Sequence, residues 1–174
     1  GESVAVIGLG ILGQLVIQYL KSGGARRIIA VDTSAKRCEL AIRSGATQAF
    51  VMPVADARDA IADTTDGEML DVVFEVTGHP AVLAPATTLL RRLGRVVLLG
   101  DSPTPSLQHL GPRVVGDSLS ILGIHGFLIP EQASARDPWT AGAMTALFFD
   151  LVQQGRMDVA PLVDRTVSPL DAPA

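Results

Sequence analysis

The sequence predicts an α/β fold, a doubly wound six-stranded parallel sheet with helices on both faces. Of its 174 residues, 48% are hydrophobic and only 4% are aromatic, which suits a parallel sheet covered by helices. Short apolar runs alternate with helix-length segments, and this alternation with short links predicts right-handed crossovers. A glycine-rich turn separates the first apolar run from the first helical segment, so a strand-turn-helix unit opens the chain.

The glycine-rich turn follows directly after the first predicted strand. Residues 4–7 form an unbroken apolar run, which is typical of a strand buried on both faces. Gly8, Gly10 and Gly13 follow in G-x-G-x-x-G spacing, and apolar residues then recur at helical intervals over residues 11–20. The motif therefore lies where a strand turns into a helix, which is the context that dinucleotide binding requires.

Each of the three glycines has a physical role in such a turn. Gly8 permits the tight turn, Gly10 has no Cβ to hold a pyrophosphate away from the backbone, and Gly13 lets the helix lie close to the strand. The free N–H groups of Ile11 and Leu12, at the positive end of the helix, would face the diphosphate. We therefore predict that these five residues bind a dinucleotide.

A second predicted strand, residues 28–31, ends in Asp32. Asp32 comes about 20 positions after Gly13, as expected of an acid that binds the adenosine ribose hydroxyls. A carboxylate here would repel a 2′-phosphate, so the sequence predicts NAD rather than NADP. The cations of Lys36 and Arg37 leave NADP as the weaker alternative.

The later segments continue the alternation of strands and helices. In chain order we expect a helix to residue 44 that Gly45 ends, a strand at 49–52, a helix at 54–64, a strand at 70–76, a helix at 80–93, strands at 95–99 and 119–124, and a last helix from Pro138 that Gly155 ends. Pro85 would cost ~3 kcal/mol inside a helix, so we expect a kink or a later helix start there.

Charge, cysteine content and hydropathy exclude several classes of function. A net charge of −4 without a long run of one sign argues against nucleic acid or an anionic membrane as a partner. The single cysteine, Cys38, can build neither a disulfide framework nor a cysteine-rich zinc site. No apolar stretch reaches the ~18 residues of a transmembrane helix and no signal peptide is visible, so we expect a cytoplasmic protein.

Five stretches of the chain together resemble one known family. They are the glycine turn at 8–13, Asp32, and the segments at 37–46, 71–78 and 90–100. With this ordered set the chain resembles the cofactor-binding domain of the medium-chain dehydrogenase/reductase superfamily, nearest its zinc-dependent alcohol and polyol dehydrogenases. The resemblance implies a Rossmann fold that binds NAD, in an oxidoreductase that transfers hydride between an alcohol or polyol hydroxyl and the nicotinamide cofactor.

The resemblance also implies cofactor contacts beyond the glycine turn and Asp32. Arg37 occupies the place of the basic partner of the ribose-binding acid, and Thr77 and Gly78 fall where the family lines the adenosine side of the cleft. The positions implied for the nicotinamide half are Leu99, Gly100 and Asp101, which touch it, and Leu122 and Ile124, which match backbone positions that bond the carboxamide.

The resembled enzymes hold their zinc with cysteine, histidine and acidic ligands outside this region. A catalytic zinc site needs about three protein ligands, and nothing in this chain replaces them. We therefore expect no catalytic residue and no metal ligand here, so that any zinc in the full-length protein is not bound by this chain. Glu75, within a buried predicted strand, is interpreted as a residue that is hydrogen-bonded structurally rather than aimed at the cleft.

We expect residues 1–174 to form a single NAD-binding domain, a fragment of a longer two-domain chain whose catalytic domain is absent. The alcohol substrate would bind through that missing domain, and the fragment alone would be inactive. In the resembled superfamily the sixth strand pairs two subunits, so we expect a homodimer through residues 119–124. An open apolar sheet edge otherwise invites aggregation.

Two alternatives stay open. A zinc-free quinone or enoyl reductase of the same superfamily would share the cofactor domain, although most of these favour NADPH, which Asp32 opposes. A non-enzymatic NAD-sensing regulatory module also uses the glycine turn and the acid, but would not be expected to carry the segments at 45–46 and 90–95. A short-chain dehydrogenase is excluded because it needs Tyr-x-x-x-Lys, and Gly23 takes the lysine position after Tyr19.

Overall fold

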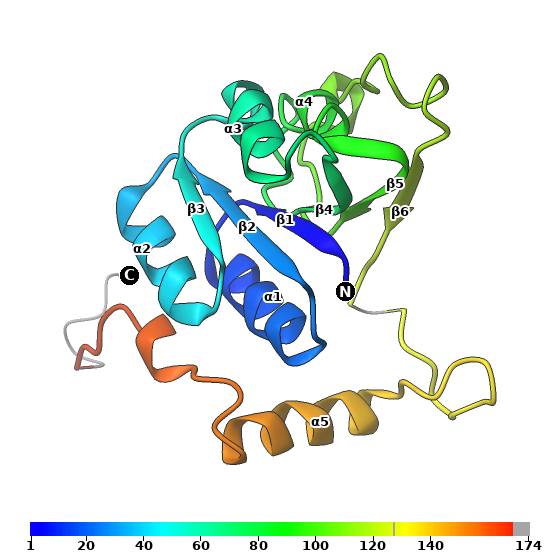
Figure 1. Ribbon diagram of the computed structural model, residues 1–174. Coiled ribbons are helices and arrows are strands. Elements are labelled where there is room, and N and C mark those ends of the chain that lie inside the picture. Colours follow the sequence, from blue (N-terminus) through cyan, green and yellow to red (C-terminus); the bar gives the residue numbers. More distant parts are fainter. Residues whose placement is uncertain (127, 169–174) are drawn as a thin grey trace.

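A computed structural model describes residues 1–126 and 128–168, in which one parallel sheet has the strand order β3-β2-β1-β4-β5-β6. Figure 1 shows the helices distributed around this sheet, which confirms the predicted doubly wound α/β fold. The elements are β1 (Ser3–Ile7), α1 (Ile11–Ser22), β2 (Arg27–Asp32), α2 (Ala35–Ser44), β3 (Gln48–Val51), α3 (Ala57–Thr64), β4 (Leu70–Glu75), α4 (Leu83–Thr87), β5 (Leu90–Leu98), β6 (Ser120–Gly123) and α5 (Ala141–Gln153).

The strand order reverses between β1 and β4. β1 pairs in parallel with β2 on one side and with β4 on the other, so the chain winds outward in opposite directions from this pair. The loops that leave the carboxyl ends of β1 and β4 therefore diverge. In open parallel sheets, this divergence creates the crevice in which ligands bind.

Apolar clusters cover both faces of the sheet. Successive strand residues point to opposite faces, so in β2 Ile29 belongs to the cluster packed by α3 and α4, whereas Ile28 belongs to the cluster packed by α1 and α2. Ile17 of α1 and Ile61 of α3 are both fully buried. Packing on both faces explains why the strands are apolar throughout instead of alternating with polar residues.

Two local sequence signals bound α2, and the end at Gly45 is as predicted. Ser34 caps the helix, because its hydroxyl accepts a hydrogen bond from the amide of Arg37. Gly45 ends it with φ +116°, a left-handed conformation that favours glycine. The helix expected at 54–64 begins instead with a 3₁₀ turn, Val54–Asp56, and becomes α-helical as α3. Such turns are frequent at helix N-termini.

The prediction of a helix through residue 93 is wrong. α4 ends at Thr87, and β5 begins at Leu90, which pairs with Leu70 of β4. Pro85 is accommodated because it occupies the first turn of this short helix, where its missing N–H is not needed. Leu90 is fully buried at the start of β5. A buried leucine fits the end of a helix equally well, so its apolar character did not distinguish a helix from a strand.

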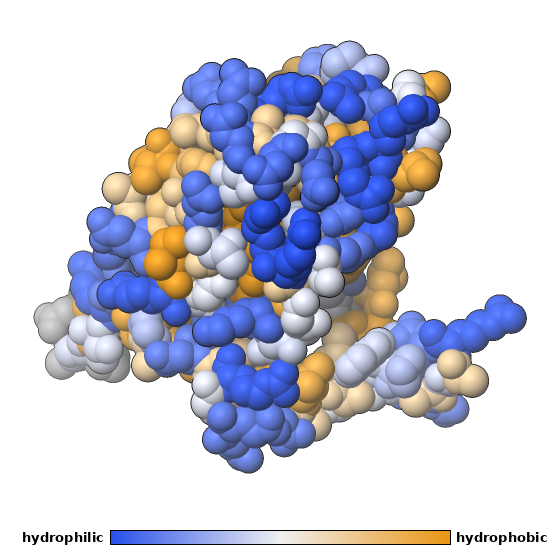
Figure 2. Space-filling view, in the orientation of Figure 1, coloured by the Kyte–Doolittle hydropathy of each residue, from blue (hydrophilic) through white to orange (hydrophobic). Residues whose placement is uncertain are grey.

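The chain after β6 runs along one side of the sheet body, and α5 lies there apart from the strands (Figure 1). Figure 2 shows hydrophobic residues scattered among hydrophilic ones on this face of the molecule. Buried Gln18 of α1 anchors the turn after α5, since its side-chain amide donates to the carbonyl of Asp158 (2.9 Å) and its oxygen accepts from the amide of Asp158 (2.7 Å). Among the described residues, no helix is long and apolar enough to cross a membrane.

Candidate functional site

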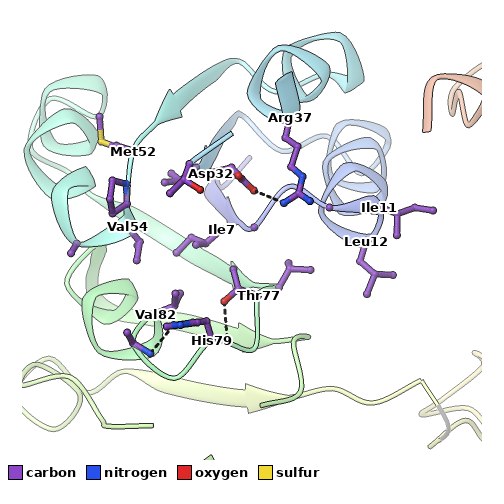
Figure 3. A pocket seen from close by; sticks show the side chains of 18 residues that line it. Ile7, Ile11, Leu12, Asp32, Arg37, Met52, Val54, Thr77, His79 and Val82 are labelled. Atoms are coloured by element: carbon purple, nitrogen blue, oxygen red, sulfur yellow. Dashed lines mark hydrogen bonds and ion pairs between the residues drawn. The ribbon is translucent and has the colours of Figure 1, made fainter. Parts of the chain in front are cut away.

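A cavity of about 730 Å³ opens at the carboxyl ends of β1, β2 and β4. Figure 3 shows Asp32 and Arg37 on one side of it, with Thr77, His79 and Val82 on the other. This is the crevice created by the reversal of strand order. Seven residues predicted from the sequence line it: Gly8, Gly10, Ile11, Leu12, Asp32, Arg37 and Thr77.

Close backbone packing accounts for two of the three motif glycines. Gly8 has φ +89°, a left-handed conformation that turns the chain after β1, and its amide donates to the carbonyl of Val31 of β2 at 3.0 Å. A Cβ on Gly13 would lie 2.1 Å from the carbonyl oxygen of Gly8, so α1 approaches β1 more closely than any side chain at this position allows. Both residues are therefore required by the fold of the turn.

Gly10 is different, because the protein itself leaves room for a side chain there. A Cβ built on Gly10 has no heavy atom within 4 Å. The residue is the N-cap of α1 but offers no side chain to cap it, and the first turn carries no acidic residue. Within the described residues, the amides of Ile11 and Leu12 have no acceptor. The cleft thus contains an open helix N-terminus that suits a phosphate group.

Asp32 holds the two loops that border the cleft. Its side chain is only 7% exposed, and Oδ2 accepts from the amide of Leu9 at 2.7 Å while Oδ1 accepts from the amide of Ser34 at 2.8 Å. The guanidinium of Arg37 lies 3.8 Å from Oδ2 and is half exposed. A carboxylate has about four lone-pair sites, so Asp32 retains acceptor capacity for a ligand hydroxyl.

An apolar wall completes the cleft, and the sequence reasoning did not find it. It comes from the loops after β3 and β4, and its members are Met52, Pro53, Val54, Ala55, Ala81 and Val82. His79 also lines the cleft, and its Nδ1 accepts from the amide of Ala81 at 3.2 Å. The rule that ligands bind outside the carboxyl ends of the strands was the signal that pointed to these loops.

A second group of predicted residues packs together beside the cleft without lining it. A Cβ on Gly78 would lie 2.3 Å from the carbonyl oxygen of Asp101, and one on Gly100 would lie 2.2 Å from the amide nitrogen of Gly78. Leu99 follows β5 in the same loop. The turn after β4 and the turn after β5 are therefore in direct backbone contact.

Leu122 and Ile124 lie farther away, on and just after the edge strand β6. These residues are 44% and 54% exposed, and neither lines the cavity. The amide of Ile124 donates to the carbonyl of Leu98 at 3.0 Å, which extends the β5–β6 pairing. The structure thus separates these two positions from the residues around the glycine turn.

No zinc site fits the described part of the chain. These residues include no group of three or more His, Cys, Asp or Glu placed to hold a metal ion, whereas a catalytic zinc takes about three protein ligands. Cys38 is buried, and its thiol donates to the carbonyls of Asp32 at 3.6 Å and Phe50 at 3.5 Å. Burial raises the pKa of the Cys38 thiol, so the thiolate that binds metals is disfavoured.

Residues 12–137 match the sequence profile of a family described as zinc-binding dehydrogenase. A curated L-threonine 3-dehydrogenase from Bacillus velezensis is 35% identical over 126 residues, which are 72% of this chain and 36% of that enzyme. The chain thus spans 36% of the length of this curated relative.

Solved structures of related proteins share the fold over nearly the whole chain. An alcohol dehydrogenase zinc-binding domain protein from Burkholderia ambifaria gives a TM-score of 0.76 at 28% identity, covering 90% of this chain and 40% of that one. Benzyl alcohol dehydrogenase from Acinetobacter calcoaceticus gives a TM-score of 0.74 at 25% identity, also covering 90% of this chain and 40% of its own.

Proposed function

Because this chain belongs to the zinc-binding dehydrogenase family, as a cofactor-binding domain of the medium-chain type, we propose that it binds NAD for an oxidoreductase. The enzyme would transfer hydride between an alcohol or polyol and the nicotinamide ring. Relatives named as threonine and benzyl alcohol dehydrogenases support this substrate class.

One observation carries the proposal. Gly10 lacks a side chain where the protein has room for one, next to two amides with no acceptor among the described residues. Packing does not require a glycine at this position. A ligand phosphate that must approach the backbone does require one, and a helix N-terminus favours its negative charge.

Different residues of the cleft would bind different parts of the dinucleotide. The amides of Ile11 and Leu12 would bind the pyrophosphate, and Asp32 would accept from the ribose hydroxyls. The apolar wall after β3 is suited to a flat adenine ring, since ligand sites are mostly apolar with a few polar groups that fix orientation. Thr77 and Gly78 remain the contacts proposed on the adenosine side, and the contacts proposed for the nicotinamide half remain Leu99, Gly100, Asp101, Leu122 and Ile124.

When bound, NAD supplies the nicotinamide carbon that accepts or returns hydride. We propose that residues 1–174 form the cofactor domain of a longer two-domain protein, in which another domain binds the substrate and any zinc. Support comes from the relatives, of which the chain covers 36% in sequence and 40% in structure. The chain alone would then bind cofactor without oxidising alcohols.

We also propose a homodimer in which β6 pairs with its counterpart. In the described residues β6 pairs with β5 on one side only, and Leu122 and Ile124 are about half exposed beside it. An uncovered edge strand is a template for pairing with another chain. Sedimentation velocity should show a dimer, and a Leu122→Lys variant should be monomeric; a monomeric wild-type chain at high concentration would contradict the proposal.

Calorimetric titration of the chain with NADH and with NADPH tests the cofactor proposal. NADH should bind more tightly by about tenfold, which corresponds to ~1.4 kcal/mol of repulsion between Asp32 and a 2′-phosphate. A preference for NADPH would favour a zinc-free quinone or enoyl reductase. If neither nucleotide binds, the assignment of the glycine turn is wrong.

A further inference from the structure

Glu75 is a buried acid at the point where the strand order reverses. It is the last residue of β4 and stands in register with Ile7 of β1 and Leu98 of β5. Its side chain is fully buried. An acidic side chain in the middle of a sheet is costly unless its oxygens find donors.

The carboxyl group of Glu75 shapes the turn after β4. Its Oε1 accepts from the amide of Thr77 at 2.7 Å, from the amide of Gly78 at 3.2 Å, and from the Thr77 hydroxyl. The main-chain carbonyl of the same residue accepts from the amides of Leu99 at 2.9 Å and Gly100 at 3.1 Å. Glu75 therefore joins the turn after β4 to the turn after β5.

The turn after β4 packs tightly against the glycine turn and against the turn after β5. Thr77 lines the cleft on the side opposite Asp32 (Figure 3). A Cβ on Gly8 would lie only 2.6 Å from the Cγ2 of Thr77, and one on Gly100 would lie 2.2 Å from the amide of Gly78. A displacement of the Thr77–Gly78 turn would therefore press on the Gly8 turn and change the width of the crevice between them.

Stability alone does not explain this residue. Its second oxygen, Oε2, is buried and has no partner among the described residues, and a buried unsatisfied polar atom costs free energy. An apolar side chain would fill the same strand position without that cost. We attribute the presence of a glutamate here to the three hydrogen bonds that Oε1 accepts, because all three donors belong to the turn that borders the cleft.

We propose that Glu75 is a positioning residue for the dinucleotide. Its carboxyl group fixes the Thr77–Gly78 turn and, through the contact of Thr77 with Gly8, sets the crevice that the pyrophosphate crosses toward the nicotinamide half. This proposal rests on the proposed function of the cleft. Asp32 and the wall after β3 border the adenosine half from the opposite side of the cleft and make no hydrogen bond with Glu75, so AMP, which does not cross the crevice, should depend less on Glu75 than NADH does.

The test compares Glu75→Leu with Glu75→Gln in titrations with NADH and with AMP. The leucine variant removes the acceptor and should raise the Kd for NADH about tenfold or more, because small misplacements in a binding site are costly, while the Kd for AMP should rise by a smaller factor. The glutamine variant retains an acceptor oxygen and should bind NADH like the wild type. If the leucine variant does not fold, Thr77→Val removes the hydroxyl donor to Oε1 and should shift the Gly8 amide resonance of the free chain, a readout that does not depend on a contact between Thr77 and the ligand.

Two outcomes would overturn the proposal. Either the variants bind NADH like the wild type, or they lose NADH and AMP in equal proportion, as a general loss of structure would cause. A readout without ligand separates this proposal from the cofactor assignment. In the free chain, Glu75→Leu should shift the amide resonance of Gly8 as well as those of Thr77 and Gly78. Failure of the wild type to bind NADH would refute the proposed function, whereas an unmoved Gly8 resonance would refute the role of Glu75.

Discussion

Replacing Gly10 by alanine should weaken cofactor binding and leave folding intact. Gly10 has φ −66° and ψ −168°, which alanine adopts freely, and a Cβ there meets no heavy atom within 4 Å. Alanine is a poorer helix N-cap than glycine, at a cost of ~0.5–1 kcal/mol. The lower entropy of the unfolded alanine chain offsets ~0.4–1 kcal/mol. We therefore expect a melting temperature within about 3 °C of the wild type.

The effect on binding should be large, because the new methyl group stands where a phosphate must approach the amides of Ile11 and Leu12. A hydrogen bond to a charged group contributes ~1.5–3 kcal/mol. Losing one such bond predicts a rise in the Kd for NADH of about 10- to 100-fold.

Titration calorimetry with NADH measures this Kd, and scanning fluorimetry measures the melting temperature of the same samples. Gly116→Ala is the matched control, since a Cβ on Gly116 also meets nothing within 4 Å but the residue does not line the cleft. The control should bind NADH like the wild type. An unchanged Kd for Gly10→Ala would refute the role of the glycine turn in holding the pyrophosphate.

Two other changes should act on stability. Gly13→Ala places a Cβ 2.1 Å from the Gly8 carbonyl oxygen, so it should lower the free energy of unfolding by about 1–3 kcal/mol; an unaltered thermal unfolding curve would contradict this close approach. Burial opposes ionisation of Asp71, but hydrogen bonds from the Ser3 amide and the Arg91 guanidinium outweigh it and hold the pKa of Asp71 below its ordinary value. The stabilisation is therefore complete above the unfolded pKa of about 4 and is lost as the pH falls through the lower folded pKa. In urea unfolding at pH 7, Asp71→Asn should have a free energy of unfolding about 1 kcal/mol lower than the wild type. This difference should shrink below about pH 4. A difference that stays constant over this pH range would contradict a stabilising role of the ionised Asp71.

The half of the cleft formed by β1, the glycine turn, α1 and Asp32 could be predicted because its signals are local. Glycine spacing, strand ends and helix periodicity all lie within a short stretch of sequence, and each acts on its immediate neighbours. The end of α2 at Gly45 was predictable for the same reason.

The rest depends on contacts between distant segments. Leu90 is buried whether it ends a helix or begins a strand, and only its pairing with Leu70 decides. The apolar wall forms because the loop after β3 faces the loop after β4. The hydrophobic periodicity of the sequence does not indicate that these two distant loops lie together. The distance of Leu122 from the cavity follows from the place of β6 at the far edge of the sheet.

The most direct test of the central claim is a titration of the ¹⁵N-labelled chain with NADH, followed by amide chemical shifts. Binding in the cleft predicts saturable shifts at Ile11, Leu12 and Thr77, with smaller changes at Ser34, whose amide bonds Asp32. Shifts confined to another surface, such as the groove that Val4, Tyr19 and Phe74 line at the opposite end of β1, would contradict the claim that this cleft is the dinucleotide site.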